Sequence, residues 1–73
     1  MAKLPVISGL KAVKAFCKAG WVASRQTRNH TIMEKIGHST TLSVPKHKEL
    51  KRGTLRSLIK DAGLTVEEFV ELL

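Results

Sequence analysis

Glycine and proline divide this chain into short segments, and that division limits the folds that the chain can form. Glycine commonly ends a helix or forms a turn, and proline ends a strand because it has no N–H to donate to the ladder. The positions concerned are Gly20, Gly37, Pro45 and Gly63. Each regular element is therefore expected to be short, and the spacing of apolar residues indicates whether it is a helix or a strand.

The first segment predicts a helix that is capped by Ser8 and runs to about Lys18. Serine favours this position because its hydroxyl accepts a hydrogen bond from a free N–H group of the first turn. The predicted apolar face of this helix consists of Leu10, Val13, Ala15, Phe16 and Cys17. Cys17 is the only cysteine, so no internal disulfide is possible, and its place on this face predicts a buried structural thiol.

Two further helices are expected in the last part of the chain. The first of them starts near Arg52 or Gly53, and Gly63 ends it. Thr65 then caps a short final helix, because Glu68 completes a T-x-x-E capping box. The longer helix carries a stripe of apolar residues at helical spacing, made of Leu55, Leu58, Ile59 and Ala62.

Three segments with strand character lie between these helices, over about residues 21–26, 30–36 and 40–44. Alternation along the first segment predicts Trp21 and Ala23 on one face and Gln26 on the other. The inward face of the second segment stays open, because Ile32 and Met33 are both apolar and point to opposite faces.

The resulting order is helix, three strands and two helices, which predicts a single α+β domain over residues 1–73. Three antiparallel strands need helices packed on one face to bury their apolar side chains. This is the architecture of the double-stranded RNA-binding domain. The other face of the sheet is expected to stay open to solvent or to a partner.

The charge of the chain is strongly uneven along its length. Residues 1–60 carry all 13 lysines and arginines and only two acids, Glu34 and Glu49, which gives 13 − 2 = +11; residues 61–73 carry four acids and no base, which gives −4. A basic body of this kind favours a polyanionic partner, and nucleic acid above all.

The lone cysteine and the lack of an apolar run of about 20 residues favour a cytoplasmic protein with no membrane contact.

Several classes of site find no support in the sequence. The histidines are separated by 8 and 9 residues, which is not a metal-ligand spacing, so neither a metal nor another cofactor is expected; they are His30, His38 and His47. Single-strand binders stack bases on exposed aromatic rings. The three aromatic residues of this chain all lie on predicted core faces, and they are Phe16, Trp21 and Phe69.

Basic residues gather before the second predicted helix, where free N–H groups and the helix dipole favour phosphate. They are Lys46, His47, Lys48, Lys51 and Arg52. The alternative is a solvated loop whose lysines only add solubility.

His30 follows a predicted turn at residues 27–29 and is flanked by Arg25 and Arg28. A histidine at such a place is, by itself, more often structural than catalytic.

Two stretches of sequence resemble the HicA (YcfA-like) family of mRNA interferase toxins. From Gly20 the chain has G-W-V-A-S-R-Q-T-R-N-H, similar to a Gly-aromatic strand, an Arg-Gln turn and a G-S-H motif. From Val44 it has V-P-K-H-K-E-L-K-R-G-T-L, followed by G-L-T and an acidic-Phe segment, similar to the second signature of that family. The opening L-P-V-I-S-G also fits, so the resemblance covers nearly the whole chain.

This resemblance implies a toxin of a type II toxin–antitoxin system, with a double-stranded RNA-binding-like fold. It places the family's catalytic histidine on His30 and its Val-Pro-x-His histidine on His47. It also implies a HicB-like antitoxin as partner, in a hetero-oligomer formed by a toxin that is monomeric when free. Since the 2′-OH of RNA is itself a nucleophile, a metal-independent endoribonuclease is expected, with RNA held by Arg25, Arg28, Lys46, His47, Lys48, Lys51 and Arg52.

One departure from the family pattern concerns the turn before His30, where Arg28 and Asn29 replace Gly-Ser. Glycine allows a positive φ that arginine tolerates poorly, so the turn is expected to hold His30 differently. Two other functions stay open, and this departure favours the first of them. One is a non-catalytic RNA-binding module on the same scaffold, and the other is a protein-interaction domain whose basic face binds an acidic partner.

Overall fold

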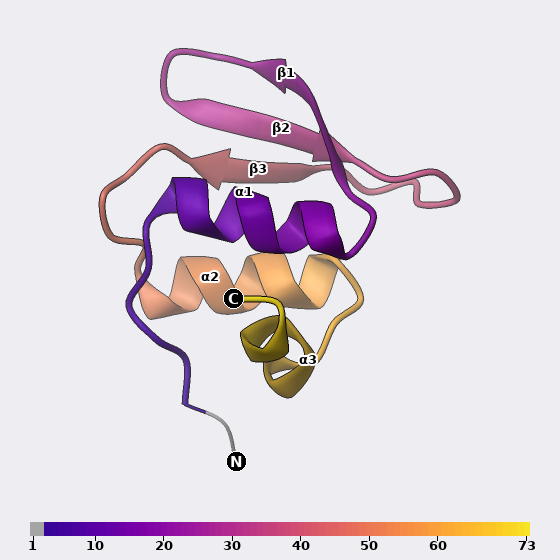
Figure 1. Cartoon of the computed structure of the whole chain (residues 1–73). Helices are drawn as coiled ribbons and strands as arrows, with labels where there is room; N and C mark the ends of the chain where they lie inside the picture. Colours follow the sequence, from indigo (N-terminus) through magenta and orange to yellow (C-terminus); the bar gives the residue numbers. More distant parts are fainter. Residues whose placement is uncertain (1–2) are drawn as a thin grey trace.

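The computed structural model of the chain describes residues 3–73, and its order of elements confirms the prediction. The three strands form one antiparallel sheet in the order β1-β2-β3, with α1 and α2 packed on one face and α3 on the side of the helices away from the sheet (Figure 1). This is the predicted α+β, double-stranded RNA-binding-like fold. The elements are α1 (Gly9–Lys18), β1 (Val22–Gln26), β2 (His30–Glu34), β3 (Leu42–Pro45), α2 (Arg52–Asp61) and α3 (Val66–Glu71).

The start of α1 is fixed by a cap and by a close contact with the end of β3. The Lys11 N–H donates to Ser8 Oγ at 3.1 Å, as predicted for an N-cap. Gly9 follows immediately, and its N–H donates to the carbonyl oxygen of His47 at 2.9 Å. A Cβ atom on Gly9 would overlap the carbonyl oxygen of Pro45, so only glycine allows this approach.

This contact sets the rotation of α1 and makes the predicted apolar face partly wrong. Leu10 is 66% exposed and Cys17 is exposed. Because Gly9 faces β3, the residues three and seven positions later also face the core; Ala12 and Phe16 are accordingly buried. Leu10 and Cys17 belong to the next stripe around the helix, so the expectation of a buried structural thiol is wrong.

The hydrophobic core lies between the sheet and the helices and contains all three aromatic residues, as predicted. Trp21, Phe16 and Phe69 are buried, and the rings of Phe16 and Phe69 lie 5.1 Å apart between centroids. Phe69 thereby joins the short helix α3 to the main core. The sequence left open which face of β2 points inward. Met33 is on the inward face and is buried, while Ile32 is half-buried on the other face.

A β-bulge in β1 overturns the predicted alternation of that strand. The pairs Ala23 with Met33 and Gln26 with Thr31 are separated by a register shift between Ala23 and Arg25. The extra residue puts Gln26 on the same, helix-facing side as Ala23. Without the bulge the two would lie on opposite faces, as the sequence predicted.

The strands are shorter than expected at the far end of the sheet. β2 ends at Glu34, because the His38 N–H donates to the carbonyl of Lys35 at 3.0 Å and Gly37 has a φ of 87°, which together form a turn. Ile36, predicted to be in the strand, lies in this turn and is fully exposed. The chain enters β3 only at Leu42.

The two C-terminal helices begin in different ways. Thr65 and Glu68 form the predicted capping box, with the Glu68 N–H donating to Thr65 Oγ1 at 3.1 Å and the Thr65 N–H donating to Glu68 Oε1 at 2.9 Å. Helix α2 starts after Lys51, whose side chain makes no capping hydrogen bond. No helix within residues 3–73 is long and apolar enough to cross a membrane.

Candidate nucleic-acid interface

The turn between β1 and β2 holds His30 through two hydrogen bonds to one threonine side chain and one to its backbone. The Thr27 N–H donates to the His30 carbonyl at 2.9 Å, and the His30 N–H donates to Thr27 Oγ1 at 3.0 Å. The Thr27 hydroxyl donates in turn to the His30 carbonyl at 3.3 Å. The backbone of His30 is therefore fixed at the first residue of β2.

This turn does not need the glycine that the family pattern has at the position of Arg28. Across residues 3–73, only glycines have a positive φ, so Arg28 and Asn29 keep ordinary backbone angles. The favoured two-residue hairpin turns contain positive φ angles. Here the Thr27 side chain closes the turn instead, and the steric objection to arginine does not apply.

His30 lies on the open face of the sheet. Its neighbour Thr31 is only 7% exposed and faces the helices, as does Met33 two residues later. Because side chains alternate along a strand, His30 and Ile32 are on the opposite face. His30 is half-buried there, with Pro45 as its cross-strand partner, while Arg25 is the partner of Ile32.

The basic segment that follows β3 is anchored by backbone hydrogen bonds along its length. The Lys46 N–H donates to the Asn29 carbonyl at 2.8 Å, His47 accepts from Gly9, and the Leu50 N–H donates to the Ile7 carbonyl at 2.8 Å. Leu50 is also buried. The backbone of this segment is therefore hydrogen-bonded to three other parts of the chain, which disfavours the alternative of a loose, solvated loop.

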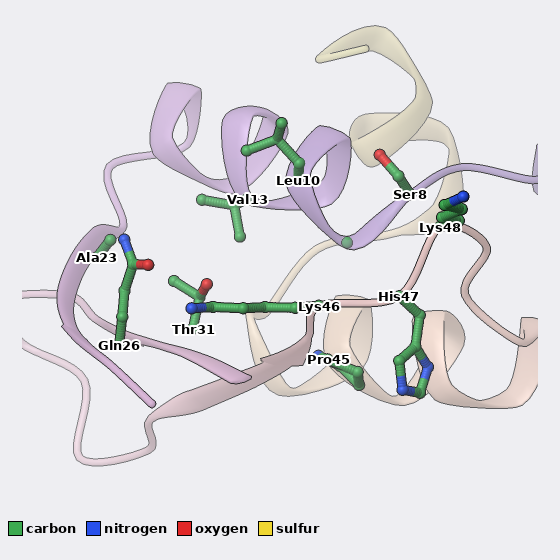
Figure 2. A pocket seen from close by; sticks show the side chains of 11 residues that line it. Ser8, Leu10, Val13, Ala23, Gln26, Thr31, Pro45, Lys46, His47 and Lys48 are labelled. Carbon is green, nitrogen blue, oxygen red and sulfur yellow. The ribbon is translucent and has the colours of Figure 1, made fainter. Parts of the chain in front are cut away.

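Lys46 differs from the other basic residues of this segment because its ammonium group is hydrogen-bonded within the protein. Figure 2 shows it extended past Thr31, in a groove of about 460 Å³ between α1 and the sheet that Leu10 and Val13 also line. Its ammonium group donates to the Thr27 carbonyl at 2.8 Å. The imidazole of His47 is turned away from Leu10 and Val13 in the same view.

The remaining predicted RNA-binding residues are all exposed and form two groups. Arg25 and Arg28 belong to the β1–β2 hairpin that carries His30. Lys48 lies in the segment before α2, and Lys51 and Arg52 lie at the start of that helix. Residues 46–47 connect the groups, because Lys46 is bonded to the turn and His47 to the start of α1.

The start of α2 has the features of a phosphate-binding helix terminus. Its N-cap residue Lys51 offers no side-chain acceptor, and its first turn contains no acid. The free N–H groups and the positive end of the dipole both favour an anion. Lys51 and Arg52 add two full positive charges at the same place.

The model of the family described as the HicA toxin of bacterial toxin–antitoxin systems matches residues 10–64. The chain belongs to the HicA toxin family. The match includes the β1–β2 turn with His30, the segment after β3 and the start of α2, and it confirms the resemblance seen in the sequence. No curated protein matches the chain.

Two residues of this HicA toxin that position the site were missed by sequence reasoning. The sequence predicts Thr27 only as part of a turn, although threonine hydroxyls commonly bond to nearby backbone and so offer a signal. Gly9 also carried one, because glycine in the first turn of a helix disfavours the helix and indicates a close backbone contact.

Within the part of the chain that the structure describes, no three or more His, Cys, Asp or Glu side chains come together in a way that could hold a metal ion. His38 lies outside the candidate site, in the turn between β2 and β3. The centroid of its ring is 5.3 Å from that of Trp21.

Proposed function

We propose that this HicA-family toxin is an endoribonuclease that cleaves mRNA, with His30 as the residue that transfers the proton. The observation that carries the proposal is the placement of His30, half-buried on the open face of the sheet in a turn closed by Thr27. A fixed backbone and an accessible ring are what a shallow catalytic position requires.

The proposed reaction uses the nucleophile that RNA carries. His30 takes the proton of a ribose 2′-OH as general base, the 2′ oxygen attacks the adjacent phosphorus, and the bond from phosphorus to the 5′ oxygen breaks. The departing 5′ oxygen takes a proton from an acid, for which His47 is the candidate; the roles of the two histidines are interchangeable in this scheme. Histidine suits both steps because its ordinary pKa is about 6.5.

The negative charge that develops on the phosphate needs cations close to His30, and the rest of the RNA needs cations farther away. Arg25 and Arg28 share the hairpin with His30 and are assigned to the scissile phosphate. Lys48, Lys51 and Arg52, with the free N–H groups of α2, are assigned to neighbouring phosphates. Binding that depends on several such contacts falls steeply with salt.

A toxin of this kind requires a partner that blocks it. We infer that a HicB-like antitoxin binds the monomeric toxin in the cytoplasm and forms a hetero-oligomer that covers the open face of the sheet. The family membership supports an antitoxin partner, and the charge of +11 on residues 1–60 favours one with an acidic binding surface.

The decisive experiment compares His30→Ala with His38→Ala, which removes a histidine outside the proposed site. Purified proteins are incubated with mRNA, with and without EDTA, and the products are resolved on denaturing gels. His30→Ala is expected to lower the cleavage rate by about 10² or more, since general base catalysis contributes that much. His38→Ala is expected to cleave within about twofold of the parent, and far-UV circular dichroism checks that both variants are folded.

Each other outcome contradicts a defined part of the proposal. Equal cleavage by the parent and by His30→Ala removes His30 from the reaction, and loss of cleavage in EDTA contradicts the metal-independent scheme. Salt-sensitive binding of RNA without cleavage would establish the RNA-binding module instead. The absence of RNA binding at low salt would leave the protein-interaction domain.

A further inference from the structure

We propose that Thr27 and Lys46 are positioning residues for His30, and that the ammonium group of Lys46 acts on the β1–β2 turn rather than on RNA. The inference rests on the proposed function, because it assigns to these residues the task of holding the catalytic histidine. It also changes the role of Lys46, which the sequence alone placed among the RNA contacts.

Thr27 replaces a backbone acceptor with its side chain. In an antiparallel hydrogen-bonded pair, each residue donates its N–H to the carbonyl of the other. Here the Thr27 N–H donates to the His30 carbonyl, but the return bond from the His30 N–H ends on Thr27 Oγ1 at 3.0 Å. The hydroxyl therefore closes the turn, and the carbonyl of Thr27 is free for another donor.

Lys46 supplies that donor and holds the turn at two points. Its ammonium donates to the Thr27 carbonyl at 2.8 Å, and its backbone N–H donates to the Asn29 carbonyl at 2.8 Å. Lys46, the first residue after β3, thus bonds to both sides of a turn that lies 17 to 19 positions earlier in the chain. A hydrogen bond from a charged donor is roughly twice as strong as one between neutral groups.

The Lys46 ammonium and the His30 side chain lie on opposite sides of the sheet. Lys46 lies in the groove on the helix side, beside Thr31 and below Leu10 and Val13 (Figure 2). His30 faces the opposite side, because Thr31, the next residue, points to the helices. RNA bound on the open face would therefore meet the imidazole, while Lys46 supports the turn from behind.

A positioning role and a phosphate contact have different kinetic signatures. A lost phosphate contact raises KM and reduces the slope of log affinity against log salt by about 0.7 for single-stranded RNA. A displaced histidine lowers kcat and leaves KM and that slope unchanged, since a misplacement of about 1 Å can cost up to 10²-fold in rate. Both parameters are obtained from the same cleavage assay at several salt concentrations.

The kinetic test uses Lys46→Met, which keeps the length of the side chain and removes its charge. Lys14→Met is the matched control, because Lys14 is an exposed lysine on α1 with no assigned role. Lys46→Met is expected to lower kcat by about 10-fold or more, with KM and the salt slope within error of the parent. Lys14→Met is expected to leave kcat within about twofold. A rise in KM with a reduced salt slope for Lys46→Met would overturn the proposal and make Lys46 an RNA contact.

Thr27 is tested by a pair of variants that differ in the hydroxyl. Thr27→Val removes the acceptor of the His30 N–H and keeps the branched shape, and Thr27→Ser keeps the hydroxyl. We expect Thr27→Val to lower kcat by about 10-fold or more and Thr27→Ser to retain most of the activity. Equal activity of the two variants would overturn the role of Thr27.

A second measurement separates failure of this proposal from failure of the proposed function. Amide hydrogen exchange of the full-length protein reports on the His30 N–H whether or not the protein cleaves RNA. That amide is expected to exchange at least about 10-fold faster in Thr27→Val and in Lys46→Met, with the amides of the central β2–β3 ladder unchanged. Unchanged exchange at His30 overturns the positioning role. Faster exchange in a protein that never cleaves RNA contradicts the proposed function alone.

Discussion

Replacing Gly9 by alanine is expected to destabilise the protein, whereas the same change at Gly53 is expected to stabilise it. Both glycines lie in the first turn of a helix, Gly9 in α1 and Gly53 in α2, and neither has a positive φ. Helix propensity and unfolded-state entropy therefore favour alanine at both sites, by about 0.4–1 kcal/mol. Any difference between the two variants measures the surroundings of the new methyl group.

The space around the new methyl group differs between the two sites: it is open at Gly53 and occupied by backbone atoms at Gly9. A Cβ atom at Gly53 would meet no atom from other parts of the chain within 4 Å, so Gly53→Ala is expected to gain the full amount of about 0.4–1 kcal/mol. A Cβ at Gly9 would overlap the carbonyl oxygen of Pro45 and lie 3.1 Å from its carbonyl carbon. These are backbone atoms of the sheet, and overpacking of this kind costs about 1–3 kcal/mol. Because the clash is with backbone atoms, the upper part of that range applies, about 2–3 kcal/mol, and subtracting the gain of about 0.4–1 kcal/mol leaves a net loss of roughly 1–2.6 kcal/mol for Gly9→Ala.

Urea denaturation followed by Trp21 fluorescence measures both changes, because Trp21 is the only tryptophan and is buried. With a slope of about 1 kcal/mol/M for a chain of this size, the midpoint of Gly9→Ala should fall by about 1–2.6 M and that of Gly53→Ala should rise by about 0.4–1 M. A Gly9→Ala protein as stable as the parent would refute the close contact between α1 and the end of β3.

Two further predictions concern buried and exposed side chains of the helices. Phe69→Ala is expected to lower the free energy of unfolding by about 3–5 kcal/mol, because Phe69 is fully buried against Phe16; a loss below about 1 kcal/mol in urea denaturation would mean that α3 is not part of the core. The exposed thiol of Cys17 is expected to react with a thiol reagent in the native protein at a rate similar to that of free cysteine, and a requirement for denaturant would show that it is buried after all.

The element order was predictable because each boundary depends on local chemistry. Ser8 and Thr65 cap helices through their own side chains, and Gly37 forms a turn through its own backbone freedom. Such signals lie within a few residues of the structure that they specify. The stripe of apolar residues in α2 is local in the same sense, and Leu55, Leu58 and Ile59 are buried as its spacing indicates.

The faces of α1 and β1 were not predictable in the same way, because they depend on distant contacts. The rotation of α1 follows from the approach of Gly9 to Pro45, which lies 36 positions later in the chain. The bulge after Ala23 depends on pairing with β2, and it moves Gln26 to the helix-facing side. Apolar periodicity alone gave Leu10 a buried position, because Gly9 can signal a close backbone contact but does not show which distant strand makes it.

In the candidate site, too, the features that depend on nearby residues were predictable and those that depend on distant contacts were not. His30 and the exposed arginines and lysines were found from local composition and from the family resemblance, since charge and motif are properties of short segments. The engagement of Lys46 with Thr27 was not found, because a lysine in a basic run is indistinguishable from its neighbours until the strands pair.

The hydrogen bonds around Lys46 and His47 connect the stability of the fold to the geometry of His30. Gly9 donates to His47, the adjacent Lys46 bonds to both sides of the β1–β2 turn, and that turn fixes His30. A shift at the start of α1 is therefore expected to move the β1–β2 turn that carries His30, because these hydrogen bonds connect the two. A small domain without a deep pocket has few other ways to hold a histidine in place. It follows that Gly9→Ala should reduce RNA cleavage even in dilute buffer, where the protein is still folded, while Gly53→Ala should not.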